Sequence, residues 1–111
     1  MISPDLRTRL LRGEKLAAEL PATRPAHRRY VVVLGVKGVP AKDPDFDGAP
    51  WRFRVSRYEL REEFLDEHPG LENLLDYQTE VVDEGTLDAA VARLASAPVV
   101  LQPAAVVDAP Y

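Results

Sequence analysis

The residues best suited to metal chemistry are three aspartates, each two residues from the next, followed at once by a glycine. They match the first, third, fifth and sixth positions of a loop that wraps calcium: Asp43, Asp45, Asp47 and Gly48. The twelfth position, where such a loop needs a bidentate glutamate, holds Arg54. We therefore expect at most weak calcium binding by these aspartates, and we predict no resident metal or cofactor.

The sequence contains few residues in a setting suited to nucleophilic or acid–base catalysis. The chain has no cysteine, which excludes disulfides, thiol nucleophiles and cysteine-ligated zinc. His68 follows two carboxylates at a predicted helix end, where the helix dipole favours an imidazolium. Ser56 lacks the glycines of a nucleophile elbow. We predict that the protein is not an enzyme. An enzyme or ligand-binding domain with a pocket near His68 and Tyr30 is the alternative.

The charge of the chain is unevenly distributed along it. The net charge is −4, but residues 1–30 carry +4 and residues 31–58 carry +2. Residues 59–88, called the acidic block below, contain eleven carboxylates and one arginine. A surface of one sign speeds association with an oppositely charged partner and repels like-charged ones. The acidic block therefore predicts a basic protein partner and argues against nucleic acid.

The most concrete function that this charge predicts is that of a small immunity or antitoxin-like protein. Such a non-enzymatic binding module would neutralise a basic, nuclease-type toxin by occluding its active site. Seven carboxylates would pair with arginines and lysines, and two tyrosines would act as aromatic anchors. These residues are Glu62, Glu63, Asp66, Glu67, Asp76, Asp83 and Glu84, with Tyr58 and Tyr77 as the anchors.

A further alternative is a regulator that binds DNA or oligomerises through its basic N-terminal segment, which carries seven of the fourteen basic residues. The chain has no apolar run of membrane-spanning length, and its first residues lack the features of a signal peptide. We therefore expect a cytoplasmic protein with no membrane contact. Arginine outnumbers lysine 11 to 3, which is typical of a GC-rich bacterial genome.

The elements that must position these residues begin with a predicted helix over residues 4–20. Ser3 can cap this helix, apolar residues recur every three to four positions, and Pro21 would end it. Residues 30–36 are nearly all apolar and β-branched, which predicts a central strand covered on both faces. Residues 51–55 alternate apolar and basic side chains, which predicts a second strand.

The second half of the chain begins with a capping box, in which Ser56 precedes Glu59 by three residues. Val55 and Leu60 can form the accompanying hydrophobic staple, so we predict a helix over residues 57–67. A strand over residues 77–82 and a helix capped by Thr86 should follow. Two strand-like segments, residues 99–101 and 104–107, are divided by a proline.

Together these elements predict a single α+β domain over residues 1–111. Their order is helix, strand, strand, helix, strand, helix, strand. We expect a mixed four-stranded sheet with about three helices packed on it.

Overall fold

The computed structural model describes residues 2–37, 50–65, 73–107 and 109. The strands are β1 (Leu16–Leu20), β2 (His27–Lys37), β3 (Pro50–Arg61), β4 (Leu75–Asp83) and β5 (Gln102–Pro103). The helices are α1 (Pro4–Leu11) and α2 (Leu87–Ala95), with 3-10 turns η1 (Glu62–Phe64), η3 (Glu84–Thr86) and η4 (Ala104–Val107). The α+β class is confirmed. Within the described residues, however, the sheet has five strands rather than four, and there are two α-helices rather than three.

Every strand pairing in the described sheet is antiparallel, so the prediction of a mixed sheet is wrong. The strand order is β4-β3-β2-β1-β5, which leaves β2 in the middle. The prediction of a central strand is confirmed there. Val31 and Val33 are buried in one apolar cluster, while Tyr30 and Val32 are buried in the other. A strand covered on both faces can bury consecutive residues, which is why its sequence is apolar throughout.

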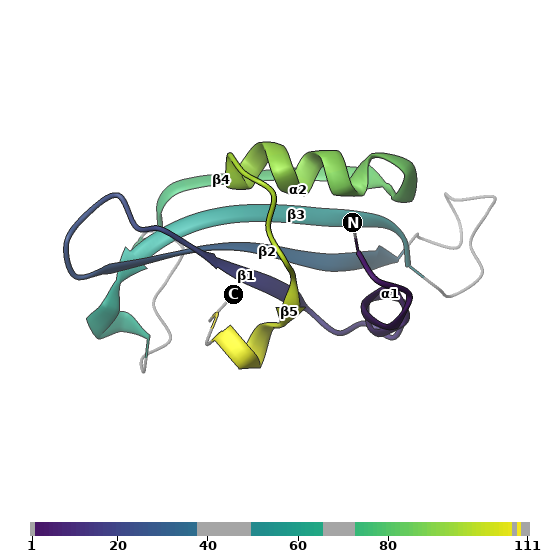
Figure 1. The fold of residues 1–111 in the computed structure, drawn as a ribbon, viewed down its shortest axis with the longest axis horizontal. Coiled ribbons are helices and arrows are strands. Elements are labelled where there is room, and N and C mark those ends of the chain that lie inside the picture. The colour runs from purple at the N-terminus through teal and green to yellow at the C-terminus, as the bar shows by residue number, and fades with distance from the viewer. Residues whose placement is uncertain (1, 38–49, 66–72, 108, 110–111) are drawn as a thin grey trace.

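The two clusters lie on opposite faces of the sheet. The face called the helix face carries Val31, Val33, Phe53 and Val55, and both helices pack against it. The other face, called the groove face, carries Tyr30, Val32 and Tyr58 under the C-terminal turn η4. Figure 1 shows α2 along one side of the sheet and η4 on the other. No helix in the described part of the chain has the length and apolar character needed to cross a membrane.

The predicted helix over residues 4–20 is wrong beyond its first two turns. Ser3 caps α1 as expected, because its hydroxyl accepts a hydrogen bond from the Leu6 N–H at 3.3 Å. Gly13 then adopts a φ of 90°, which ends the helical region. Leu16–Leu20 forms β1 instead and buries side chains in both apolar clusters. Pairing with β2 and β5 outweighs the helical spacing of these residues.

The predicted helix over residues 57–67 is also wrong, because β3 continues to Arg61 and only η1 follows it. Ser56 is a mid-strand residue in β3 rather than a helix cap. Val55 and Leu60 are both fully buried, but in opposite clusters, so they form no staple. The capping box is a local signal, and the backbone hydrogen bonds from β2 and β4 on either side of β3 override it.

The end of the chain departs from prediction in two details. The helix stripe is confirmed, since Leu87, Val91 and Leu94 are buried. Thr86 does not cap this helix with its side chain; instead, Asp83 accepts hydrogen bonds from Thr86 in the turn before it. Of the two strand-like segments, residues 104–107 form η4 and residues 99–101 are not strand.

Candidate functional site

The carboxylates of the acidic block do not form one surface among the described residues. Glu62 and Glu63 follow β3 at the end of the sheet where Arg61 pairs with His27. Asp83 and Glu84 lie at the other end, where Asp83 pairs with Arg52. Arg61 lies nine residues after Arg52 in β3, which corresponds to about 30 Å along the strand. Asp66 and Glu67 lie outside the described residues.

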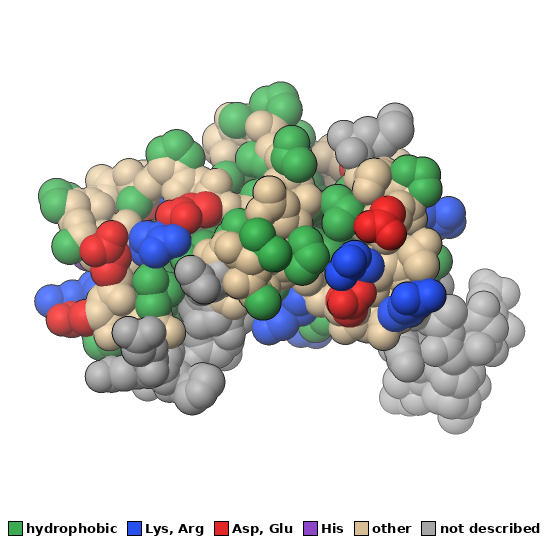
Figure 2. Space-filling model, turned by 60° about the horizontal axis from the view of Figure 1, so that its bottom comes forward, with side chains coloured by type: hydrophobic (Ala, Val, Ile, Leu, Met, Phe, Trp, Pro, Cys, Tyr) green, Lys and Arg blue, Asp and Glu red, His purple; other side chains and the backbone are tan. Residues whose placement is uncertain are grey.

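Five of the eight acidic-block carboxylates that the structure describes form ion pairs with arginines. These five carboxylates make seven ion pairs: Glu59 with Arg24 and Arg29, Asp76 with the same two arginines, Glu63 with Arg61, Glu80 with Arg93, and Glu84 with Arg7. Figure 2 likewise shows red and blue side chains next to each other at both ends of the visible face, with hydrophobic side chains between them. Ion pairs therefore compensate part of the negative charge of the acidic block.

The most closely connected of these groups is the Glu59 cluster, formed by Glu59, Thr23, Arg24, Arg29 and Asp76. Glu59 is fully buried, and its carboxylate accepts hydrogen bonds from the Thr23 N–H at 2.8 Å and the Thr23 hydroxyl at 2.9 Å. Arg24 donates to it at 2.5 Å and Arg29 at 3.3 Å. Both arginines also donate to Asp76 at 3.2 Å. The cluster joins the β1–β2 connection to β3 and β4.

The pKa values in the Glu59 cluster follow from these contacts. Burial by itself would raise the pKa of Glu59, but hydrogen bonds from Thr23, Arg24 and Arg29 outweigh it and hold that pKa below its usual value. Hydrogen bonds from Arg24 and Arg29 lower the pKa of Asp76. Both carboxylates are therefore charged at neutral pH and balance the two arginines.

The position of Glu59 in the sequence is a signal that could have indicated this cluster. Glu59 stands between Tyr58 and Leu60, two residues that the structure buries in the groove-face cluster. A carboxylate at that position of a strand points to the other face, where it needs a cationic partner if it is buried. The capping-box interpretation hid this signal. Asp76 of the cluster and Ala26 of the β1–β2 connection adopt positive φ values, 52° and 57°.

A groove of about 270 Å³ opens on the groove face of the sheet, beside the part that η4 covers. The adjacent strands β2, β3 and β4 supply its walls, since alternate residues of a strand share a face, and Lys15, just before β1, completes them. The lining residues are Lys15, Val32, Leu34, Arg54, Ser56, Tyr58 and Tyr77. Most of this lining is apolar or aromatic, and none of it is acidic.

The two cations of the groove differ from most of the described arginines. Lys15 and Arg54 form no ion pair with another described residue, whereas seven arginines elsewhere in the described chain do so. Arg54 is exposed, and Val81 lies opposite it in β4 with 52% of its surface exposed. The groove therefore combines exposed apolar surface with two cations that have no ion-pair partner among the described residues.

The two predicted aromatic anchors have different environments in the groove. Tyr58 is only 1% exposed and packs against Tyr30, with their ring centroids 5.8 Å apart. Tyr77 is 46% exposed and stands at the groove rim. Tyr77 can present a ring to a partner directly, while Tyr58 supplies part of the floor.

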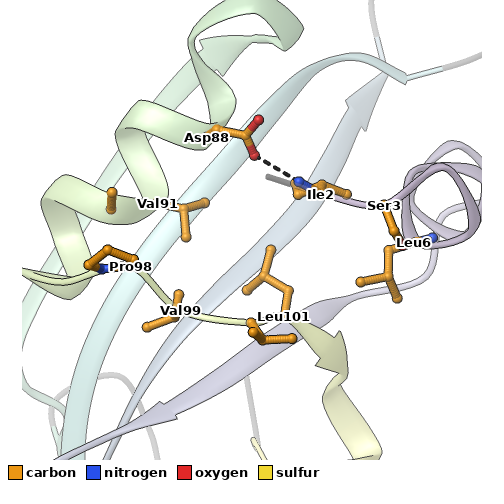
Figure 3. Close-up of a pocket in the computed structure, with 10 residues that line it drawn as sticks. Ile2, Ser3, Leu6, Asp88, Val91, Pro98, Val99 and Leu101 are labelled. Carbon is orange, nitrogen blue, oxygen red and sulfur yellow. Dashed lines mark hydrogen bonds between the residues drawn. The ribbon is translucent and has the colours of Figure 1, made fainter.

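A second cleft of about 270 Å³ lies between the N-terminal segment and α2 (Figure 3). Ile2, Val91 and Leu101 point into it, and the Ile2 N–H donates a hydrogen bond to Asp88 at 3.1 Å. The other side chains labelled around this bond are mostly apolar. The cleft therefore lies where the N-terminal segment packs against α2 on the helix face.

The residues that the sequence suggested for metal binding or acid–base chemistry do not form a common site among the described residues. Asp43, Asp45, Asp47 and His68 lie outside the part of the chain that the structure describes. Ser56 shares a hydrogen bond with the Thr79 hydroxyl at 3.1 Å, and the His27 Nδ1 atom lies 2.7 Å from the Pro25 carbonyl oxygen. Tyr30 is fully buried. Among the described residues, no group of three potential ligand side chains is placed to hold a metal.

Comparisons of the chain with protein-family models, with curated proteins and with solved structures found no match.

Proposed function

We propose that the protein is a non-enzymatic binding module that holds a short acidic segment of a partner protein in the groove of its sheet. The observation that carries this proposal is the placement of Lys15 and Arg54. Both line the groove beside Tyr77, and neither has a carboxylate partner among the described residues. In a chain with a net charge of −4, cations left without such partners on one surface indicate an anionic ligand.

The apolar lining defines the rest of the ligand. Val32, Leu34 and Tyr58 supply a floor that can take an aliphatic or aromatic side chain. A carboxylate on the same segment then reaches the Lys15 ammonium or the Arg54 guanidinium. The volume of 270 Å³ is at the small end for ligand pockets, which suits one or two side chains of a peptide.

Nucleic acid fits the groove less well than an acidic peptide. Nucleic-acid binding depends on many phosphate contacts, and two lysine or arginine side chains line the groove. The net negative charge of the protein also repels a polyanion more strongly than a short peptide, because the repulsion grows with the charge of the ligand.

The proposal is tested with a labelled peptide of alternating glutamate and leucine, and with its glutamine–leucine counterpart, by fluorescence anisotropy. We expect the glutamate peptide to bind more tightly, and its affinity to fall as salt rises. Arg54→Glu and Lys15→Glu should each weaken that binding by about tenfold, because a favourable charge contact becomes a repulsive one. Arg12→Glu makes the same charge change at an exposed site after α1 and should leave the affinity nearly unchanged.

Equal binding of the two peptides, or equal weakening by Arg54→Glu and Arg12→Glu, would contradict a charge-selective groove. A single-stranded oligonucleotide of similar length serves as the competing anion. If it binds more tightly than the glutamate peptide and loses affinity in Arg54→Glu, the partner is a nucleic acid and the peptide proposal is wrong.

The second candidate is neutralisation of a basic protein, as the acidic block predicts. The exposure of Glu62 and Glu84 supports it, although Glu84 already pairs with Arg7. A labelled lysine–leucine peptide is the matching probe. If it binds more tightly than the glutamate peptide and Glu62→Gln weakens it, the acidic residues are the binding surface and the groove is not.

A further inference from the structure

The outer edge of β4 is the second surface that suits a partner. β4 ends the strand order, so one of its edges has no neighbouring strand among the described residues. Most of its nine residues are exposed. Two of the exposed residues are large and apolar, Tyr77 and Val81. A long edge strand with exposed apolar side chains is a ready site for pairing with another strand.

Acidic side chains often protect such edges, but those of β4 are engaged within the protein. Asp76 is held by Arg24 and Arg29 in the Glu59 cluster. Glu80 pairs with Arg93 of α2. The Asp83 carboxylate accepts hydrogen bonds from the Thr86 N–H and hydroxyl at 3.0 Å each. Arginines therefore compensate the charges of Asp76 and Glu80, and the Asp83 carboxylate is held by hydrogen bonds within its own chain.

The side chains along this edge are symmetric about Thr79. Tyr77 lies two residues before it and Val81 two residues after it. All three point to the groove face, because Thr79 bonds Ser56 there, Tyr77 lines the groove, and Val81 lies opposite Arg54. Two copies of β4 paired antiparallel about Thr79 would place each Tyr77 against the Val81 of the other copy. Aromatic and β-branched side chains are favourable cross-strand pairs.

We propose that the protein forms a two-fold symmetric dimer by antiparallel pairing of β4 with β4 of a second copy, centred on Thr79. In this register, Glu80 lies opposite Gln78 of the second copy. Asp76, with a φ of 52°, ends the regular extended part of the edge. No two carboxylates are directly opposed, so the pairing avoids the repulsion that like charges would cause. A shift of the pairing register by one residue would separate Tyr77 from Val81 of the second copy.

The dimer would join the two five-stranded sheets into one. Its contact consists of one strand pair and the side chains around it, which is smaller than a standard protein interface. We therefore expect dimerisation to depend on protein concentration. The proposal rests on the β4 edge and shares one residue, Tyr77, with the rim of the groove.

The first test is sedimentation or light scattering across a dilution series of the full chain. We expect a mass that approaches twice the 12.3 kDa of the monomer at high concentration. Thr79→Lys places like charges opposite each other on the two-fold axis and should shift the midpoint to higher concentration by about tenfold or more. Val106→Lys, at an exposed position of η4, is the matched control and should behave as the wild type.

The second test uses the absence of native cysteine to read the register. Opposed residues of antiparallel strands have Cα atoms about 4.5 or 5.5 Å apart, within reach of a disulfide. Thr79→Cys should therefore form a covalent dimer under mild oxidation. Val81→Cys should not, because each Val81 lies opposite Tyr77 of the second copy, four residues away from the other Val81. Thermal unfolding of each variant verifies that it is folded.

A monomer at every concentration would overturn the proposal. So would a dimer that forms equally well in Thr79→Lys and Val106→Lys, since its interface would then lie elsewhere. Faster crosslinking of Val81→Cys than of Thr79→Cys would exclude the Thr79-centred register.

Discussion

The hydroxyl groups of Ser56 in β3 and Thr79 in β4 lie 3.1 Å apart and share a hydrogen bond across the groove face. This bond marks the register of β3 and β4, in which Arg54 lies opposite Val81. The same register brings Tyr77 to the rim of the groove. The proposed ligand groove and the proposed dimer edge are therefore neighbouring parts of one sheet face.

Glu59→Gln should destabilise the protein more than any exposed charge change. The substitution leaves Arg24 and Arg29 with one carboxylate, Asp76, and weakens a buried network. We expect a loss of about 3 kcal/mol in the free energy of unfolding. Urea denaturation measures it, with Glu62→Gln at an exposed site as the control. A loss no larger than that of the control would mean that the cluster contributes little.

Stability should fall as the pH is lowered into the acid range. Glu59, Asp76 and Glu80 all have pKa values below those of the unfolded chain, so each contributes stability while it is ionised. That contribution is present above the unfolded value of about 4. It is lost as the pH falls through the lower folded values. The free energy of unfolding should therefore drop below about pH 5, and the drop should be shallower in the Glu59→Gln, Asp76→Asn double variant.

Ser96→Gly should stabilise the end of α2. Ser96 follows the helix with a φ of 62°, in the left-handed region where a side chain is strained and glycine is not. We expect a gain of about 0.5 kcal/mol in unfolding free energy, because the greater freedom of glycine in the unfolded chain offsets part of the relief. Ala89→Gly, at an exposed position within α2, should instead cost about 1 kcal/mol.

Leu94→Ala should distinguish core from surface in the helices. Leu94 of α2 is almost fully buried on the helix face, and its loss should leave a cavity that costs about 3 kcal/mol. Leu11→Ala removes a partly exposed side chain of α1 and should cost under about 1 kcal/mol. Similar losses for the two variants in denaturant titrations would show that α2 is not anchored as described.

Local sequence signals succeeded where tertiary contacts agree with them. The apolar run of residues 30–36 predicted β2, and Ser3 before Pro4 predicted the start of α1. The apolar stripe from Leu87 to Leu94 predicted α2. In each case the local preference and the final packing favour the same conformation, so the pattern is informative by itself.

The same signals failed where distant strands compete with them. Leu16–Leu20 has apolar residues compatible with helical spacing, and Ser56 and Glu59 have the spacing of a capping box. Both segments are strands because β2 pairs with each of them along its length. The hydrogen bonds of a sheet join residues far apart in the sequence. The residues next to either segment in the sequence therefore do not show that it will pair as a strand.

The sequence by itself determined the α+β composition, the central strand, and the total charge of −4. Only the tertiary structure decided where that charge lies, because ion pairs form between residues as distant as Arg24 and Asp76. Folding pairs three carboxylates of the acidic block, Glu59, Asp76 and Glu84, with arginines of residues 1–30. It leaves Lys15 and Arg54 without described carboxylate partners, since the sheet places both on a face that holds no acidic lining residue. The sign of the candidate binding surface is thus a property of the fold, and it is opposite to the sign of the chain.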